Sequence, residues 1–82
     1  MKISYTPTPV DVLNAFNKVN RDALYVIWHG WSSDLWNIQL DSPSFGYKES
    51  EALLHCTTCE EVEYYAELLG VKYKRLKSLF DV

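Results

Sequence analysis

The sequence lacks most of the motifs that would identify an enzyme. Its three glycines are separated from one another, so the chain has no glycine-rich loop to hold a phosphate group. No Gly-x-Ser-x-Gly segment occurs, which excludes the nucleophile elbow of the hydrolases that use one. From these absences we expect a protein that is not an enzyme and that carries no cofactor.

The sequence also has few cysteines, no long apolar run and no excess of basic residues. Two cysteines cannot build a disulfide framework. No apolar run approaches the roughly 20 residues that cross a membrane, and residues 1–5 lead into Thr-Pro-Thr-Pro without the apolar segment of a signal peptide. Eight basic residues against eleven acidic ones leave a net charge of −3, unlike a domain that coats a nucleic-acid backbone. We therefore expect a cytoplasmic protein that does not enter membranes.

Large apolar groups are plentiful instead. Of the 82 residues, 48% are hydrophobic, and the aromatic residues comprise three Trp, six Tyr and three Phe. Such a composition excludes intrinsic disorder, and the length allows one hydrophobic core but not two. Residues 1–82 are therefore predicted to form a single domain.

Local patterns in the first half predict a helix and a hairpin. Thr8 can cap a helix over residues 9–19, which has a proline in its first turn and apolar residues at helical spacing. Residues 23–28 are β-branched and aromatic, which predicts a strand buried on both faces. Residues 35–40 alternate and predict a half-exposed strand, whose solvent side carries Asn37, Gln39 and Asp41. The turn-forming residues 30–34 join these two strands.

The second half is predicted to be mainly helical. Thr58 and Glu61 have the spacing of a capping box and open a helix that ends at Gly70. Residues 49–56 fit either a short helix or a strand. Residues 71–80 also allow both, and we favour a helix because four large residues recur at helical spacing, namely Tyr73, Leu76, Leu79 and Phe80. Together these elements predict an α+β fold, with an N-terminal helix, a small antiparallel sheet centred on the Trp-rich hairpin, and one or two C-terminal helices.

A Cys-x-x-Cys pair, Cys56 and Cys59, stands beside His55. A structural zinc site needs four ligands, and His29 is the one other imidazole in the sequence. A redox role would use a helix N-terminus to lower a thiol pKa, but the glutamates that follow would raise the pKa again. We favour two thiols that pack against a helix, and keep a zinc or thiol role for Cys56 and Cys59 as a third hypothesis.

Three tryptophans, Trp28, Trp31 and Trp36, lie on or beside the predicted hairpin. Strand alternation can place Trp28 and Trp36 in the core, whereas Trp31 lies in the turn. Trp31 either folds back to cap the core, which the small size of the domain favours, or projects as an interface anchor. In the second case we expect a partner-binding surface at the hairpin tip, formed by Trp31, Ser32, Ser33 and Asp34.

Charge is segregated along the second half of the chain. Residues 49–67 hold six acidic residues and no basic one, and residues 71–82 hold four basic residues and one acidic. Glu60, Glu63 and Glu67 share one helical face, which we expect to be exposed and include in the partner-binding surface. Such segregation can steer a charged partner, or it can serve complementarity between neighbouring elements of the same domain.

Residues 62–80 suggest a different kind of partner. A small residue, Ala66, is followed four positions later by Gly70, then by an apolar residue and by further apolar positions in a second helix. This pattern resembles the helix-turn-helix motif of DNA-binding repressors. The resemblance implies a recognition helix whose basic residues contact phosphates and base edges, namely Lys72, Lys74, Arg75 and Lys77.

The sequence as a whole favours non-catalytic protein binding. A small, aromatic-rich domain of this kind suits an inhibitor or an adaptor of a larger complex, in the manner of phage-type accessory or antagonist proteins. DNA binding through the basic C-terminal residues is the principal alternative. The sequence leaves open whether the chain forms a homodimer.

Overall fold

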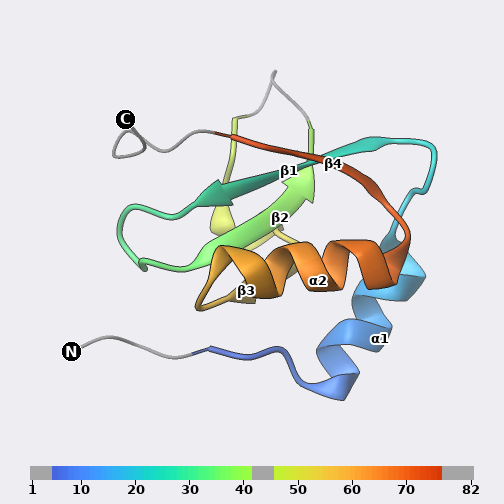
Figure 1. Ribbon diagram of the computed structural model, residues 1–82, viewed down its shortest axis with the longest axis horizontal. Helices are drawn as coiled ribbons and strands as arrows, with labels where there is room; N and C mark the ends of the chain where they lie inside the picture. The colour runs from blue at the N-terminus through green and yellow to red at the C-terminus, as the bar shows by residue number, and fades with distance from the viewer. Residues whose placement is uncertain (1–4, 42–45, 77–82) are drawn as a thin grey trace.

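The protein has an α+β fold, as predicted (Figure 1). The computed structural model describes residues 5–41 and 46–76. In chain order, the elements of this part are helix α1 (Pro9–Lys18), strands β1 (Leu24–His29) and β2 (Trp36–Leu40), a 3-10 turn η1 (Glu49–Glu51), strand β3 (Leu54–Cys56), helix α2 (Cys59–Leu69) and strand β4 (Lys72–Arg75). Within residues 5–41 and 46–76, no helix has the length and apolar character needed to cross a bilayer.

Both helices begin at the predicted caps. The backbone N–H of Asp11 donates to the Thr8 hydroxyl over 3.1 Å, and the backbone N–H of Thr8 donates to the Asp11 carboxylate over 3.0 Å. These bonds with Thr8 lower the pKa of Asp11, because they stabilise its charged form. Thr58 caps α2 in a similar way, accepting from the backbone N–H of Glu61, and Gly70 ends α2 with a φ of 74°.

The sheet is mixed, whereas the sequence predicted an antiparallel one. Its strand order is β3-β2-β1-β4. The β1–β2 hairpin is antiparallel, with Ile27 opposite Ile38, and β3 is antiparallel to β2. Strand β4 is parallel to β1 and places Arg75 opposite Ile27. The reason is the connection: α2 carries the chain back across the sheet, which is the usual way to reach a parallel neighbour.

The helix predicted over residues 71–80 is wrong in its described part. Lys72–Arg75 forms a strand, and the backbone N–H of Leu76 donates to the Ile27 carbonyl over 2.8 Å. The unpaired edge of β1 satisfies these backbone groups, and this tertiary pairing outweighs the helical spacing of the apolar residues. The second helix implied by the helix-turn-helix resemblance is therefore absent from residues 71–76, and Lys77 lies outside the described residues.

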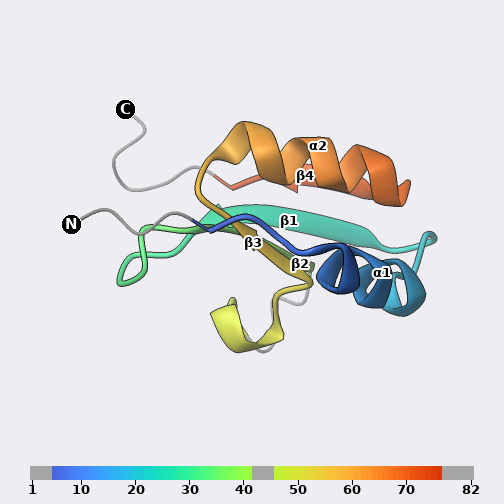
Figure 2. The ribbon, with the colours of Figure 1, turned by 90° about the horizontal axis from the view of Figure 1, so that it is seen from below.

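Helix α2 covers one face of the sheet, and η1 lies on the opposite side (Figure 2). Helix α1 contacts α2 and the edge strand β3. The buried core lies mainly between α2 and the sheet and consists of Ala15, Tyr25, Ile27, Ile38, Leu54, Cys56, Cys59, Val62, Ala66, Leu69 and Val71.

Strand β2 is more buried than its alternation predicted. Asn37 and Gln39, which were expected to face solvent, are fully or almost fully buried. Residues 46–53, which include η1, cover their face of the sheet (Figure 2). Gln39 accepts from the backbone N–H of Lys48 over 3.0 Å, and Asn37 donates to the Leu35 carbonyl over 3.2 Å. Their polar groups are thus paired inside a second, hydrogen-bonded layer.

Candidate functional site

The tip of the β1–β2 hairpin is a closed turn. The backbone N–H of Gly30 donates to the Leu35 carbonyl over 2.8 Å, and the N–H of Asp34 donates to the Gly30 carbonyl over 3.0 Å. Asp34 has a φ of 59°, a left-handed conformation that Asp tolerates better than most residues. The predicted turn over residues 30–34 is confirmed.

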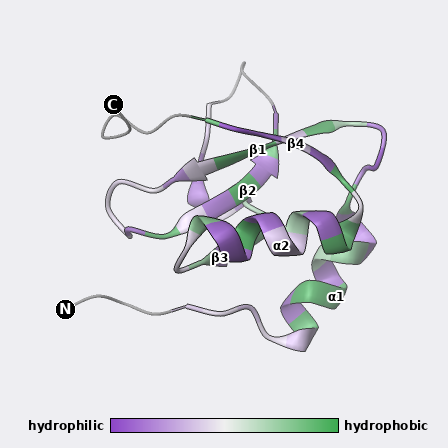
Figure 3. Ribbon diagram, in the orientation of Figure 1, coloured by the Kyte–Doolittle hydropathy of each residue, from purple (hydrophilic) through white to green (hydrophobic). Residues whose placement is uncertain are grey.

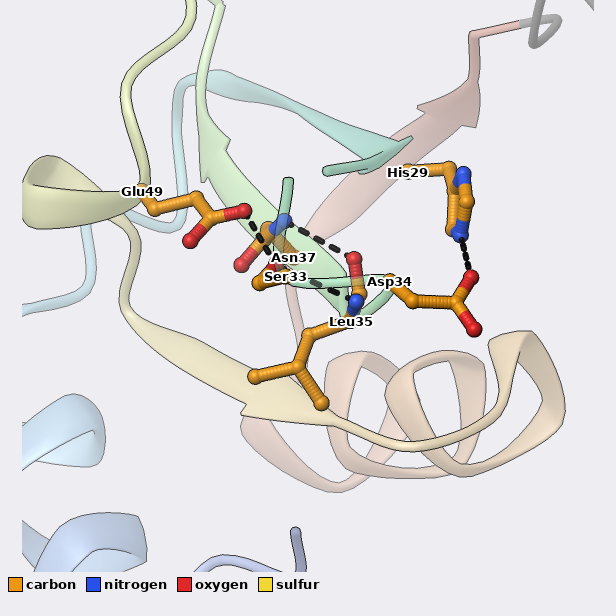
Figure 4. A network of polar contacts seen from close by, with 6 residues as sticks. All are labelled: His29, Ser33, Asp34, Leu35, Asn37 and Glu49. Atoms are coloured by element: carbon orange, nitrogen blue, oxygen red, sulfur yellow. Dashed lines mark hydrogen bonds and ion pairs between the residues drawn. The ribbon is translucent and has the colours of Figure 1, made fainter. Parts of the chain in front are cut away.

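Side chains tie this turn to two other elements (Figure 4). The Ser33 hydroxyl donates to the carboxylate of Glu49 in η1, and it accepts from the backbone N–H of Leu35 over 3.2 Å. On the other side of the turn, Nε2 of His29 in β1 donates to the Asp34 carboxylate over 2.6 Å. The tip is therefore held from both sides rather than projecting as a loose loop.

Gly30 makes the contact with Glu49 possible. A Cβ atom at position 30 would lie 1.9 Å from Oε1 of Glu49 and 2.8 Å from Oγ of Ser33. Real Cβ atoms essentially never approach another atom so closely. Glycine at position 30 thus leaves room for the Glu49 carboxylate, which would have to move if a larger residue stood there.

Trp31 projects from this turn with 71% of its surface exposed. The alternative in which Trp31 folds back to cap the core is therefore wrong. Ser32 and Asp34 are exposed as well, and Ser33 is half-buried because it bonds to Glu49. The four residues predicted for the tip surface lie together, with the tryptophan as their largest exposed group.

The other two tryptophans lie on the strands that flank the turn, Trp28 on β1 and Trp36 on β2. Trp36 is half-buried between the His29 ring, whose centroid is 5.0 Å away, and the Arg75 guanidinium, 4.9 Å from the ring centroid. Trp28 packs against Tyr47 on the opposite face, with ring centroids 6.1 Å apart. Among the described buried side-chain nitrogen and oxygen atoms, Nε1 of Trp28 is the one without a hydrogen-bond partner.

The predicted acidic face lies along α2 and is directed in part at β4. Glu60 and Glu67 are exposed, as expected, and Glu63 is half-buried. The Tyr73 hydroxyl donates to Glu67 over 3.4 Å. Burial raises the pKa of Tyr73, and the negative charges of Glu67 and Glu63 raise it further. The acidic face therefore serves internal contacts with β4 as well as solvent.

The basic residues of the DNA-binding alternative alternate across β4. Lys72 and Lys74 are exposed on the sheet face away from α2, where Lys74 pairs with Asp41 over 3.4 Å. Arg75 points to the other face and stacks on Trp36. The strand therefore places Lys72 and Lys74 on one face of the sheet and Arg75 on the other, and no recognition helix carries these charges in residues 71–76.

The two cysteines lie in the core, with Cys56 fully buried and Cys59 7% exposed. Burial raises the pKa of Cys56 to about 12, with a smaller contribution from Glu61, and burial also raises the pKa of Cys59. His55 points to the opposite face of β3 from Cys56, because neighbours in a strand alternate, and there it bonds to Asn37. Among residues 5–41 and 46–76, no group of three or more His, Cys, Asp and Glu side chains could hold a metal ion.

Sequence reasoning missed an apolar groove between α1 and α2. The groove has a volume of about 550 Å³, and its walls include Leu13 and Phe16 from α1 and Leu68 from α2. Leu13 and Phe16 are among the apolar residues at helical spacing in residues 9–19, and both are about half exposed. A second pocket of about 410 Å³ is polar and lies beside His55 and Lys18. Neither pocket has a local sequence signal, because each is formed by segments far apart in the chain.

No family model matches this chain, and no curated protein or solved structure matches it either.

Proposed function

We propose that this chain is a non-catalytic protein-binding module whose main contact surface is the hairpin tip around Trp31. The observation that carries the proposal is the exposure of Trp31, 71% of whose surface faces solvent in a turn held from both sides. A tryptophan supplies a large contact area at a small entropic cost and is among the residues most enriched in interface hot spots.

The support beneath the turn favours tight binding. Binding by a loose loop loses affinity to the ordering of the backbone and side chains. Here Ser33 is bonded to η1 and Asp34 to β1 before any partner arrives. The contact surface is thus already organised, which suits the rigid recognition expected of an inhibitor or an adaptor.

The acidic face on α2 is the second part of the proposed surface. Glu60 and Glu67 are exposed, and the chain carries a net charge of −3. Exposed charges of one sign mainly accelerate encounter with an oppositely charged partner and contribute less to the final affinity. We therefore expect a partner with a basic surface, whose association rate falls as salt is added.

The test uses the tagged full chain to capture partners from native lysate treated with nuclease. We expect a near-stoichiometric protein partner for the wild type and a loss of roughly 2 kcal/mol, about 30-fold in Kd, for Trp31→Ala. The matched control is Leu40→Ala, which truncates an exposed apolar residue at the end of β2 remote from the turn and should leave capture unchanged.

Two outcomes would contradict this proposal. A partner that binds wild type and Trp31→Ala equally well would show that the tip is not the contact surface. Partners that vanish with nuclease, accompanied by nucleic acid in untreated samples, would favour the alternative that uses the basic residues of β4.

A further inference from the structure

A second surface, remote from the hairpin tip in the sequence, exposes large apolar side chains. Both helices carry hydrophobic residues (Figure 3). Four large hydrophobic side chains that line the groove between α1 and α2 are exposed, with exposed fractions of 59% for Leu13, 49% for Phe16, 61% for Tyr64 and 56% for Leu68. This set is called the helical patch below.

The area of the helical patch is large enough to require an explanation. Taking roughly 200 Å² for a large side chain, four of them at about half exposure leave on the order of 450 Å² of mostly apolar surface. The largest apolar patch of a typical monomer is roughly 300–600 Å² and is often functional. The patch is therefore comparable in size to the largest apolar patch of a typical monomer.

Much of the apolar side of helix α1 is not covered by the rest of the domain. Of its ten residues, Ala15 is the one that is fully buried, although the helix also carries Val10, Val12, Leu13 and Phe16. Its contacts with α2 and β3 use one narrow strip. A body seated in the groove would bury the rest of the apolar side of α1 and hold the helix against the domain.

We infer that the groove is covered by a second copy of this chain in a two-fold symmetric dimer. An isologous interface needs one surface that is complementary to itself. The helical patch offers one surface to a two-fold contact, with Leu13 and Phe16 of α1 and Tyr64 and Leu68 of α2 around a hollow of about 550 Å³. Two patches together would bury on the order of 900 Å² of apolar surface, close to the roughly 1,000 Å² that a specific interface should exceed, before any polar rim is added.

The experiment is sedimentation equilibrium of the full chain from about 1 to 500 μM, a range that covers micromolar dissociation constants. We expect wild type to pass from monomer to dimer. Leu13→Glu and Leu68→Glu should each weaken the dimer at least tenfold, and both keep the fold because these side chains are already more than half exposed. The matched control is Leu76→Glu, which follows β4 on the opposite edge of the sheet and should dimerise like wild type.

A wild-type chain that stays monomeric up to about 500 μM overturns the inference and leaves the patch to a different partner. Equal dimerisation of wild type and Leu13→Glu overturns it as well.

This inference does not depend on the proposed function. Trp31→Ala should leave the monomer–dimer equilibrium unchanged while it weakens capture of the protein partner. Leu13→Glu should weaken the dimer without altering the hairpin tip. The two readouts therefore separate a failure of the dimer from a failure of the tip.

Discussion

Replacing Gly30 with alanine places a methyl group where the Glu49 carboxylate now lies. The new Cβ would stand 1.9 Å from Oε1 of Glu49, so this carboxylate must swing away and release the Ser33 hydroxyl. The obstruction is the end of a flexible side chain rather than backbone, so the sheet itself need not move. The predicted cost is therefore the lost hydrogen bond and not a broken core.

The magnitude follows from that bond. A hydrogen bond to a charged group contributes about 1.5–3 kcal/mol, and the lower end applies because Glu49 is half-buried and solvates readily once displaced. Alanine also lowers the conformational entropy of the unfolded chain, which stabilises the folded state by about 0.4–1 kcal/mol. We expect Gly30→Ala to lower the free energy of unfolding by about 1 kcal/mol, measured by urea titration as a lower midpoint at unchanged slope.

A double-mutant cycle identifies the cause. In a Glu49→Ala background no carboxylate obstructs the methyl group, so Gly30→Ala should be neutral or slightly stabilising there. The coupling free energy between positions 30 and 49 should be about 1.5 kcal/mol, the contribution of the lost hydrogen bond. An equal cost of Gly30→Ala in both backgrounds would refute the reasoning, since the strain would then come from the backbone or from Ser33.

Two further predictions concern the half-buried Trp28 and the buried Cys56. Trp28→Phe removes the buried Nε1–H that has no hydrogen-bond partner. Removing that unsatisfied donor stabilises the protein by about 1–3 kcal/mol, which offsets the packing lost with the smaller ring, so the free energy of unfolding should change by less than about 1 kcal/mol. Trp28→Ala should instead lower the free energy of unfolding by roughly 3 kcal/mol in the same urea assay. The pKa of Cys56 rises from 9.0 to about 12 on folding, so between these pH values the unfolded chain loses a proton that the folded chain keeps. Stability should therefore be intact below pH 9 and decline toward pH 12, less steeply in Cys56→Ala; equal slopes for wild type and this variant would contradict that explanation.

Local sequence signals were sufficient for the helix starts and the hairpin. Thr8 and Thr58 each cap a helix through a bond to a backbone N–H three residues later, and Gly70 ends α2 through a left-handed conformation. The turn over residues 30–34 closes on its own backbone. These features depend on atoms within a few residues of one another, so a short window of sequence contains the whole cause.

Strand β4 and the burial of β2 were decided by partners distant in sequence. Residues 72–75 have spacing that suits a helix or a strand, and the free edge of β1, more than forty residues earlier, determined the outcome. Asn37 and Gln39 alternate like solvent-facing residues, yet residues 46–53 fold over them and supply hydrogen bonds. Polar character alone does not show whether water or protein will satisfy a group.

The candidate surfaces divide in the same way. The sequence by itself determined that Trp31 lies in a turn, that Glu60, Glu63 and Glu67 share a helical face, and that the chain carries net negative charge. Only the tertiary structure decided that Trp31 projects, that Glu49 holds the turn, and that α1 and α2 leave an apolar groove between them. Exposure is a property of how whole elements pack, because a side chain loses water only when another element arrives to replace it.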